Sequence, residues 1–128
     1  MLILTFYKAC VRSAVEYASA VWHTGLTVEQ TDRIESIQRR ALRIIEPDLS
    51  YQEALALTGL ETLHARRERM ARAFFVGILN PSHRLHHLLP DPRPVIYGLR
   101  RQHLYPGVSL RTQRARKTLV CYGLDNWQ

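Results

Sequence analysis

Residues 27–47, TVEQTDRIESIQRRALRIIEP, contain signals for both ends of one helix. Thr27 and Gln30 form a capping box, in which the Thr27 hydroxyl accepts a hydrogen bond from the Gln30 amide and the Gln30 side chain reaches back. Apolar residues recur every three or four positions as far as Ile45, and Pro47 cannot continue a helix. The stretch therefore predicts an amphipathic helix with one face in a core. The predicted inward residues are Ile34, Ile37, Ala41, Ile44 and Ile45.

Similar signals on both sides predict further helices. A regular apolar stripe predicts a helix over residues 2–22, which the chain breaks at Gly25. A second capping box, from Ser50 to Glu53, opens a short helix that Gly59 closes as a left-handed C-cap. The inward residues predicted for the first helix are Ile3, Tyr7, Cys10, Ala14, Tyr17 and Val21.

The remaining chain predicts one long helix, a connector and a short final helix. The long helix covers residues 63–79, with Leu63, Met70, Phe74 and Ile78 facing inward, and the final helix covers residues 119–127. Prolines and glycines crowd residues 90–108, and no stretch predicts a β-strand. The predicted class is all-α. It consists of a bundle of about four helices over residues 1–89, an extended basic connector over residues 90–118, and a C-terminal helix over residues 119–128 packing on the bundle.

Charge is distributed unevenly along the 128 residues. The formal net charge is +7, and 16 of the 18 basic residues are arginine. Residues 1–64 sum to −2 and residues 65–128 to +9. This asymmetry favours an anionic partner for the second half, and arginine suits bidentate phosphate contacts. A GC-rich coding sequence would also favour arginine without any function.

The sequence contains none of the familiar catalytic motifs for phosphate loops, dinucleotide folds, nucleophile elbows or zinc proteases. Its four aspartates are scattered, so we expect no catalytic residue and no cofactor in this chain. The spacing of His83 and His87 suits zinc, but no cysteine or acid nearby completes a site, so we expect no metal. No apolar run is long enough to span a membrane, and we expect Cys10 and Cys121 to be reduced. These features predict an intracellular protein, nuclear or cytoplasmic.

Two arginine-rich stretches and a basic series in the connector, Arg93, Arg100 and Arg101, are the candidates for binding nucleic acid. In HARRERMARAFF, residues 64–75, Arg67 falls on the apolar face, so we expect a structural role with a carboxylate or helix-end carbonyls as partner. SLRTQRARK, residues 109–117, has four positive charges within seven residues and no acid. Tyrosines interleaved with nearby arginines suit stacking on bases, or they anchor the connector to the core. The candidate phosphate contacts are Arg66, Arg69, Arg72, Arg100, Arg101, Arg111, Arg114, Arg116 and Lys117.

The basic residues of residues 28–45 favour the plainer interpretation of a solvated helix face. Glu29 precedes Arg33 by four positions and Glu35 precedes Arg39 by four, the order that favours surface ion pairs. Arg40 and Arg43 are left with spare charge.

Several blocks, read together, carry a family resemblance. They are FYKACVRSAVEYASAVWHTGL, DRIESIQRRALRII, SYQEALALTGLETLHARRERM, FFVGILNPSHRLHHLLP and SLRTQRARKTLVCYGLDNWQ. In this order the chain resembles the thumb and the following segment of the reverse transcriptase of LINE-type (non-LTR) retrotransposons, of the jockey-like kind. The resemblance covers essentially all 128 residues. The matching positions are Tyr7, Arg12, Glu16, Tyr17, Trp22, Arg33, Gln38, Ala41, Arg67, Pro81, Arg84, Leu85, Arg111, Thr112, Arg114 and Trp127.

This resemblance implies a helical element that holds a template–primer duplex of an RNA-directed DNA polymerase. The catalytic aspartates and their Mg²⁺ would belong to a palm domain upstream of Met1, so this chain alone is expected to be inactive. Tyr17, Trp22, Gly59 and Trp127 are expected to be structural. Gly123 and Asp125 depart from the family pattern, which expects better helix formers in the last helix.

Two other interpretations remain open. The apolar face of residues 2–22 would suit a helical protein-interaction module, docking on a missing palm or on a second copy. The chain could also be a non-functional remnant of a retrotransposon, although its caps and stripes are intact.

Overall fold

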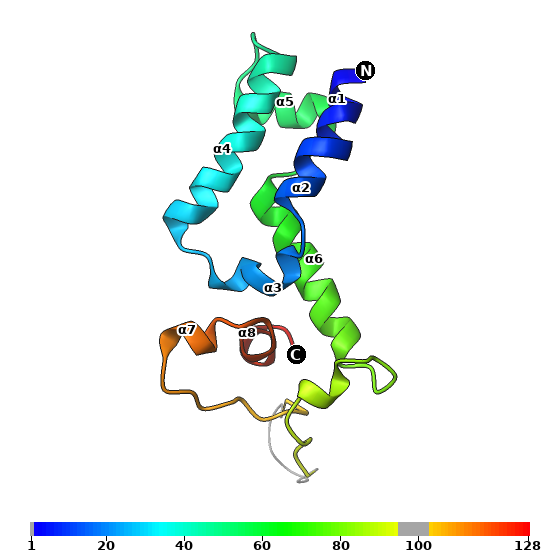
Figure 1. Ribbon diagram of the computed structural model, residues 1–128, viewed down its shortest axis with the longest axis vertical. Helices are drawn as coiled ribbons and strands as arrows, with labels where there is room; N and C mark the ends of the chain where they lie inside the picture. Colours follow the sequence, from blue (N-terminus) through cyan, green and yellow to red (C-terminus); the bar gives the residue numbers. More distant parts are fainter. Residues whose placement is uncertain (1, 95–102) are drawn as a thin grey trace. The chain divides into compact units, whose positions relative to one another are not determined.

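The computed structural model describes residues 2–94 and 103–128, and within these ranges all regular structure is helical, which confirms the all-α class. The α-helices are more numerous than the four or so predicted, mainly because the first predicted helix is divided. Their bounds are α1 Leu2–Phe6, α2 Ser13–Val15, α3 Ser19–Trp22, α4 Val28–Ile45, α5 Tyr51–Thr58, α6 Leu63–Ile78, α7 Gln113–Arg116 and α8 Leu119–Asn126 (Figure 1). A π-helix covers Tyr7–Arg12, and 3₁₀-helices cover His23–Gly25 and His86–Leu88.

The chain forms two compact units, each with its own core. Unit 1 comprises Met1–Ser19 and Leu26–Arg69, and unit 2 comprises Ala20–Gly25 and Met70–Gln128. The chain passes from one unit to the other after Ser19, after Gly25 and, within α6, after Arg69, whereas the sequence predicted domain boundaries after residues 89 and 118. The predicted extended connector contains a helical turn, α7, among its described residues.

The prediction of one continuous helix over residues 2–22 is wrong, and so is most of its predicted inward face. After α1 the chain takes a wide π-turn, and at Ala18 the backbone adopts a left-handed conformation with φ 52°. Because of this wide turn, the next residue after Tyr7 that packs against the core is Val11, and the predicted Cys10 is exposed. Within unit 1, Ile3, Cys10, Ala14 and Tyr17 of the predicted inward stripe are exposed.

In unit 1, α4 begins and ends where the sequence predicted, but its buried face is rotated. Thr27 Oγ1 accepts from the Gln30 amide at 3.2 Å, and Gln30 Oε1 accepts from the Thr27 amide at 3.0 Å. The buried residues are Glu35, Gln38 and Leu42, while Ile37 and Ile44 are exposed, contrary to prediction. Glu35 and Gln38 can be buried because their side chains form hydrogen bonds with other parts of the unit.

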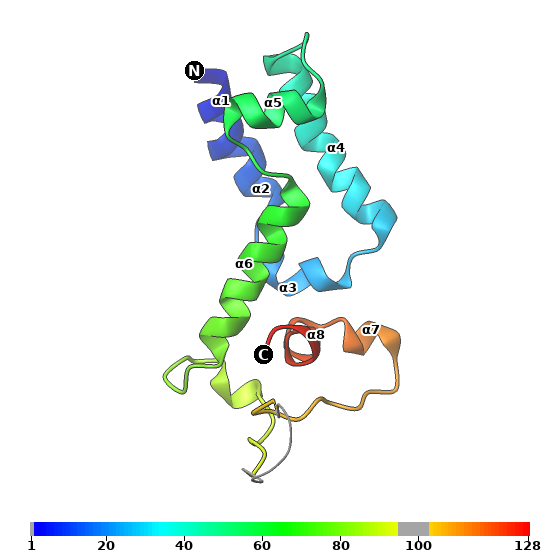
Figure 2. The same ribbon diagram turned by 180° about the vertical axis from the view of Figure 1, so that it is seen from behind.

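A small apolar core joins the first helices of unit 1 to α5. Tyr7, Leu42, Ala54, Leu55 and Leu60 are its buried members. Both views show α5 lying across the ends of α1 and α4 (Figure 1, Figure 2). The predicted capping box at Ser50 and the left-handed C-cap at Gly59 (φ 67°) are both present.

One face of α6 is buried along its whole length. The helix has the predicted start and ends one residue earlier than predicted, with Leu63, Arg67, Ala71, Phe75 and Ile78 fully buried. Phe74, predicted to face inward, is instead more than one-third exposed.

The core of unit 2 packs α8 against the second half of α6. Phe75, Ile78, Tyr105, Leu119 and Leu124 are among its buried members. The two chain segments around Tyr105 and Gln128 are joined by two hydrogen bonds: the Tyr105 amide donates to Gln128 Oε1 at 3.1 Å, and Gln128 Nε2 donates to the Tyr105 carbonyl at 2.9 Å. Tyr105, whose side chain is buried in this core, therefore anchors the connector to it.

Candidate nucleic-acid interface

The net positive charge of the molecule is confined to one of its two units. Unit 1 contains nine basic and nine acidic side chains, whereas unit 2 contains nine basic side chains and two acidic ones, Asp91 and Asp125. Unit 2 therefore carries the whole net charge of +7. A net positive charge of this size raises the local concentration of polyanions.

Residues 109–117 present their basic side chains on an anchored helical turn. Thr112 caps α7, since its Oγ1 accepts from the Ala115 amide at 3.2 Å. At the other end, Thr24 Oγ1 donates to the Lys117 carbonyl at 2.5 Å. The side chains of Arg111, Arg114 and Lys117 are exposed.

Arg116 differs from its basic neighbours, because its Nε donates to the Leu110 carbonyl at 3.2 Å. Part of its guanidinium thus holds the turn in place. The matching positions of the resemblance include Arg111, Thr112 and Arg114 but not Arg116, so the sequence did not point to this contact.

No ion pair between described residues neutralises Arg111, Arg114, Arg116 or Lys117. We therefore define these four side chains as the α7 basic surface. Their charges act in solution at full strength, apart from screening by salt.

Arg66 and Arg69, two of the candidate phosphate contacts, belong to unit 1 and are paired with acids. Arg66 Nε lies 2.7 Å from Glu16 Oε1, and Glu16 is buried. Glu61 lies 3.9 Å from Arg66 NH1 and forms a second ion pair with Arg69. The hydrogen bond and charge of Glu61 raise the pKa of Arg69. Glu16 and Glu61 thus balance the charges of Arg66 and Arg69, so neither arginine is a strong candidate for phosphate binding.

The remaining candidates are Arg72, Arg100 and Arg101. Arg72 is exposed on the part of α6 that belongs to unit 2. Arg100, Arg101 and the interleaved Tyr97 lie outside the described residues.

Arg67 lies on the buried face of α6 and is fully inaccessible to solvent. Its burial lowers the pKa of the guanidinium, while the nearby carboxylates of Glu35 and Glu16 raise it. A buried cation of this kind needs opposite charges close by. The acidic neighbours are the kind of partner that the sequence suggested for this residue.

Glu35 has a role that the sequence did not reveal. The predicted Glu35–Arg39 ion pair is wrong: the Glu35 carboxylate turns inward and accepts from the amides of Leu63 and His64, at 3.1 Å each. Thr62 Oγ1 accepts from the next amide, that of Ala65, at 3.2 Å. A carboxylate from α4 thus caps the start of α6, where the helix dipole favours negative charge.

Gln38 extends this buried polar cluster across unit 1. Its Oε1 accepts from the Tyr7 hydroxyl at 2.7 Å, and its Nε2 donates to Tyr51 Oη at 3.1 Å and to the Glu61 carbonyl at 2.9 Å. The Tyr51 hydroxyl donates to Glu35. Burial, as the larger cause, and this hydrogen bond together raise the pKa of Tyr51 to about 12. Burial also raises the pKa of Tyr7.

Because Glu35 turns inward and does not pair with Arg39, the Arg39 side chain has a different neighbour. Its guanidinium lies over the Tyr51 ring, 5.2 Å from the centroid. The other predicted pair of α4 is present, with Arg33 Nε 3.8 Å from Glu29 Oε1, and both side chains are about four-fifths exposed. The plain interpretation of this helix face as solvated surface is consistent with these contacts.

The residues predicted to be structural occupy different environments. Tyr17 is 82% exposed, whereas Trp22 and Trp127 are half-buried. The Trp127 ring packs on Phe75 and Tyr122, with centroids 6.0 and 5.1 Å away. Gly59 has the conformation that its predicted role requires.

The histidines of residues 83–87 are used in local hydrogen bonds. His86 Nδ1 lies 2.9 Å from the Ile78 carbonyl at the end of α6, and His87 Nδ1 lies 2.9 Å from the Arg84 carbonyl. Among residues 2–94 and 103–128 no cluster of three His, Cys, Asp or Glu side chains is arranged to hold a metal. In the same ranges no helix has the length and apolar character needed to cross a bilayer.

Comparisons of the chain with protein-family models, with curated proteins and with solved structures find no match.

Proposed function

We propose that this chain binds the phosphate backbone of RNA, DNA or an RNA–DNA hybrid through unit 2 and has no catalytic site of its own. The observation that carries the proposal is the confinement of the whole net charge of +7 to unit 2, where the α7 basic surface lacks acidic partners among the described residues. Phosphate contacts of this kind do not read sequence. An intracellular location, nuclear or cytoplasmic, is part of the proposal.

The resemblance to the thumb and following segment of a LINE-type reverse transcriptase is the second support. Tyr7, Glu16, Gln38 and Arg67 belong to the matching positions, and all four are buried in unit 1. Buried polar groups depend on particular partners and are harder to exchange than apolar ones. A resemblance that includes them is more specific than one based on an apolar stripe. We therefore propose that the chain acts as this part of such a polymerase.

A salt titration of binding to an RNA–DNA hybrid tests the proposal. Each phosphate contact contributes roughly 0.7–0.9 to the slope of log K against log salt. The triple variant Arg111→Ala, Arg114→Ala, Lys117→Ala should lower that slope by about 2 and weaken binding at low salt by at least tenfold. Affinity of the unaltered chain that hardly changes with salt would contradict the proposal.

The matched control removes the same charge from unit 1, through Arg33→Ala, Arg40→Ala, Arg43→Ala. These side chains are exposed on α4, so their loss should not disturb the core. We expect the control to bind nearly as well as the unaltered chain. Equal losses in the two triple variants would mean that net charge alone, and not the α7 basic surface, determines binding.

A second candidate function is protein interaction through α1. Leu2, Ile3 and Phe6 are 88%, 56% and 62% exposed. Three neighbouring apolar side chains on one short helix favour association with a partner or a second copy. Light scattering separates the candidates: a dimer indifferent to nucleic acid supports interaction, and a monomer that binds the hybrid supports the first proposal.

A further inference from the structure

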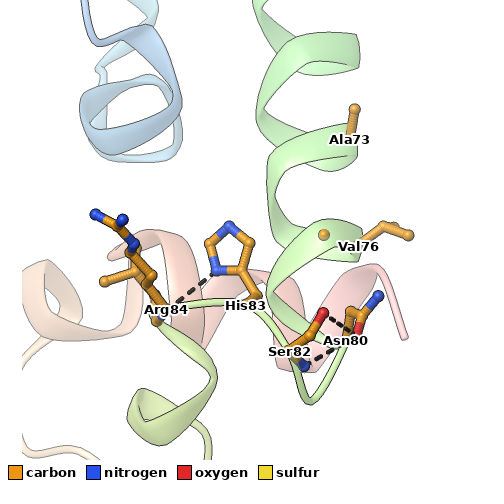
Figure 3. Close-up of a pocket in the computed structure, with 8 residues that line it drawn as sticks. Ala73, Val76, Asn80, Ser82, His83 and Arg84 are labelled. Carbon is orange, nitrogen blue, oxygen red and sulfur yellow. Dashed lines mark hydrogen bonds between the residues drawn. The ribbon is translucent and has the colours of Figure 1, made fainter.

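A groove in unit 2 lies between the second half of α6 and the turn that follows it (Figure 3). It is open to solvent and has a volume of about 850 Å³. One side is formed by Ala73, Val76 and Gly77 of α6, and Leu85 adds a further apolar group. The groove therefore offers an apolar surface that a flat ring could cover.

The polar residues of the turn offer mainly hydrogen-bond donors to this groove. Asn80 Oδ1 already accepts from the Ser82 amide at 3.0 Å and from Ser82 Oγ at 2.8 Å, which leaves the Asn80 amino group to donate (Figure 3). His83 Nδ1 accepts from the Leu85 amide at 3.2 Å, so in the neutral ring the proton is on Nε2. Arg84 contributes further donors.

The His83 ring is held in place on the helix side. It meets the Phe74 ring edge to face, with centroids 5.8 Å apart. Its Cδ2 lies 3.9 Å from where a Cβ atom at Gly77 would be. The groove thus has one fixed aromatic edge beside an apolar surface.

The charge around the groove complements a nucleic-acid strand. Arg84 lines the groove, and Arg72 lies one turn before Val76 on α6, with both side chains exposed. Unit 2 has seven more basic than acidic side chains. Neighbouring phosphates of a strand would therefore meet positive charge at Arg84 and on the exposed side of α6 at Arg72.

We propose that this groove binds an unpaired nucleobase, with Arg84 contacting an adjacent phosphate, so that a single strand gains a contact in this groove that a fully paired duplex cannot make. A base has an apolar face for the α6 surface and carbonyl and ring-nitrogen acceptors for Asn80 and His83. A paired base presents neither its face nor its pairing edge. This inference rests on the proposed function, because it assumes a nucleic-acid partner.

The test compares the affinities of a 12-nucleotide uracil strand and a 12-base-pair RNA–DNA hybrid by fluorescence anisotropy. Gly77→Leu places a side chain against His83 and fills part of the groove. It should weaken binding of the single strand at least fivefold and change binding of the hybrid less than twofold. Gly25→Leu is the control, since Gly25 belongs to unit 2 and a Cβ there meets no atom within 4 Å.

Ala73→Trp provides a second way to fill the groove if Gly77→Leu lowers the melting temperature, because Ala73 is exposed on the same wall. Selective loss of single-strand binding in either folded variant supports the groove. Equal loss for strand and hybrid, or no loss for either, overturns it and leaves the backbone proposal standing. An unaltered chain that binds neither ligand overturns the proposed function itself.

Discussion

Phe75 and Gly123 are in close contact: a Cβ atom at position 123 would lie 2.3 Å from Phe75 Cδ2. Glycine at this position was expected to weaken α8, but it allows the helix backbone to approach the Phe75 ring. Gly123→Ala should therefore overpack the core of unit 2 and lower the free energy of unfolding by about 1–3 kcal/mol, despite the better helix propensity of alanine. Chemical denaturation measures this difference.

Gly77 provides the matched control for this prediction. It also lies in a helix, but a Cβ there would have only one neighbour within 4 Å, at 3.9 Å. Gly77→Ala should raise the free energy of unfolding by about 0.5 kcal/mol, because glycine is the poorer helix former. Similar effects of the two substitutions would mean that Phe75 does not approach Gly123 as closely as described.

Glu35→Gln tests the cap that α4 supplies to α6. The change removes a charge that accepts from two backbone amides and faces the buried Arg67. Hydrogen bonds to charged groups contribute more than neutral ones, so we expect a loss of about 2–3 kcal/mol in denaturant unfolding. Glu29→Gln removes an exposed pair of the same helix and should cost less than about 0.5 kcal/mol. Equal costs would argue against an inward Glu35.

Stability should decline at alkaline pH because of the buried tyrosines. The pKa of Tyr51 is about 12 in the folded chain, against 10.0 for an ordinary tyrosine. Below pH 10 both states are protonated, and between pH 10 and 12 only the unfolded state loses its proton, so the free energy of unfolding falls through this window. Tyr51→Phe should make the decline shallower in urea titrations at pH 9, 10 and 11. A slope unaffected by this substitution would place the Tyr51 hydroxyl in solvent.

Local signals in the sequence identified most helix ends correctly. The capping boxes at Thr27 and Ser50, the C-cap at Gly59 and the limits of α8 within one residue all follow from interactions between near neighbours. Such interactions depend little on the rest of the fold.

The buried faces were predicted less well, because tertiary contacts decide them. Periodicity counts Glu35 and Gln38 as solvent-facing, yet Tyr7, Tyr51 and the amides of α6 satisfy both in the core. The π-turn at Tyr7–Arg12 shifts the inward face of residues 2–22, and no residue type in the sequence indicates that turn. In the candidate site, the sequence identified the basic run of residues 109–117, but it could not show that Glu16 and Glu61 neutralise Arg66 and Arg69.

The α7 basic surface should separate into binding and supporting side chains. Arg111→Ala, Arg114→Ala removes two exposed charges that make no side-chain hydrogen bond to another described residue, so binding to the hybrid should weaken several-fold without a change in melting temperature. Arg116→Ala, Lys117→Ala removes the same charge together with the Arg116 bond to the Leu110 carbonyl. This second pair should weaken binding and also increase hydrogen exchange at the amides of α7. If both pairs lower affinity equally and leave exchange unchanged, the run is a solvated basic face in which Arg116 supports nothing.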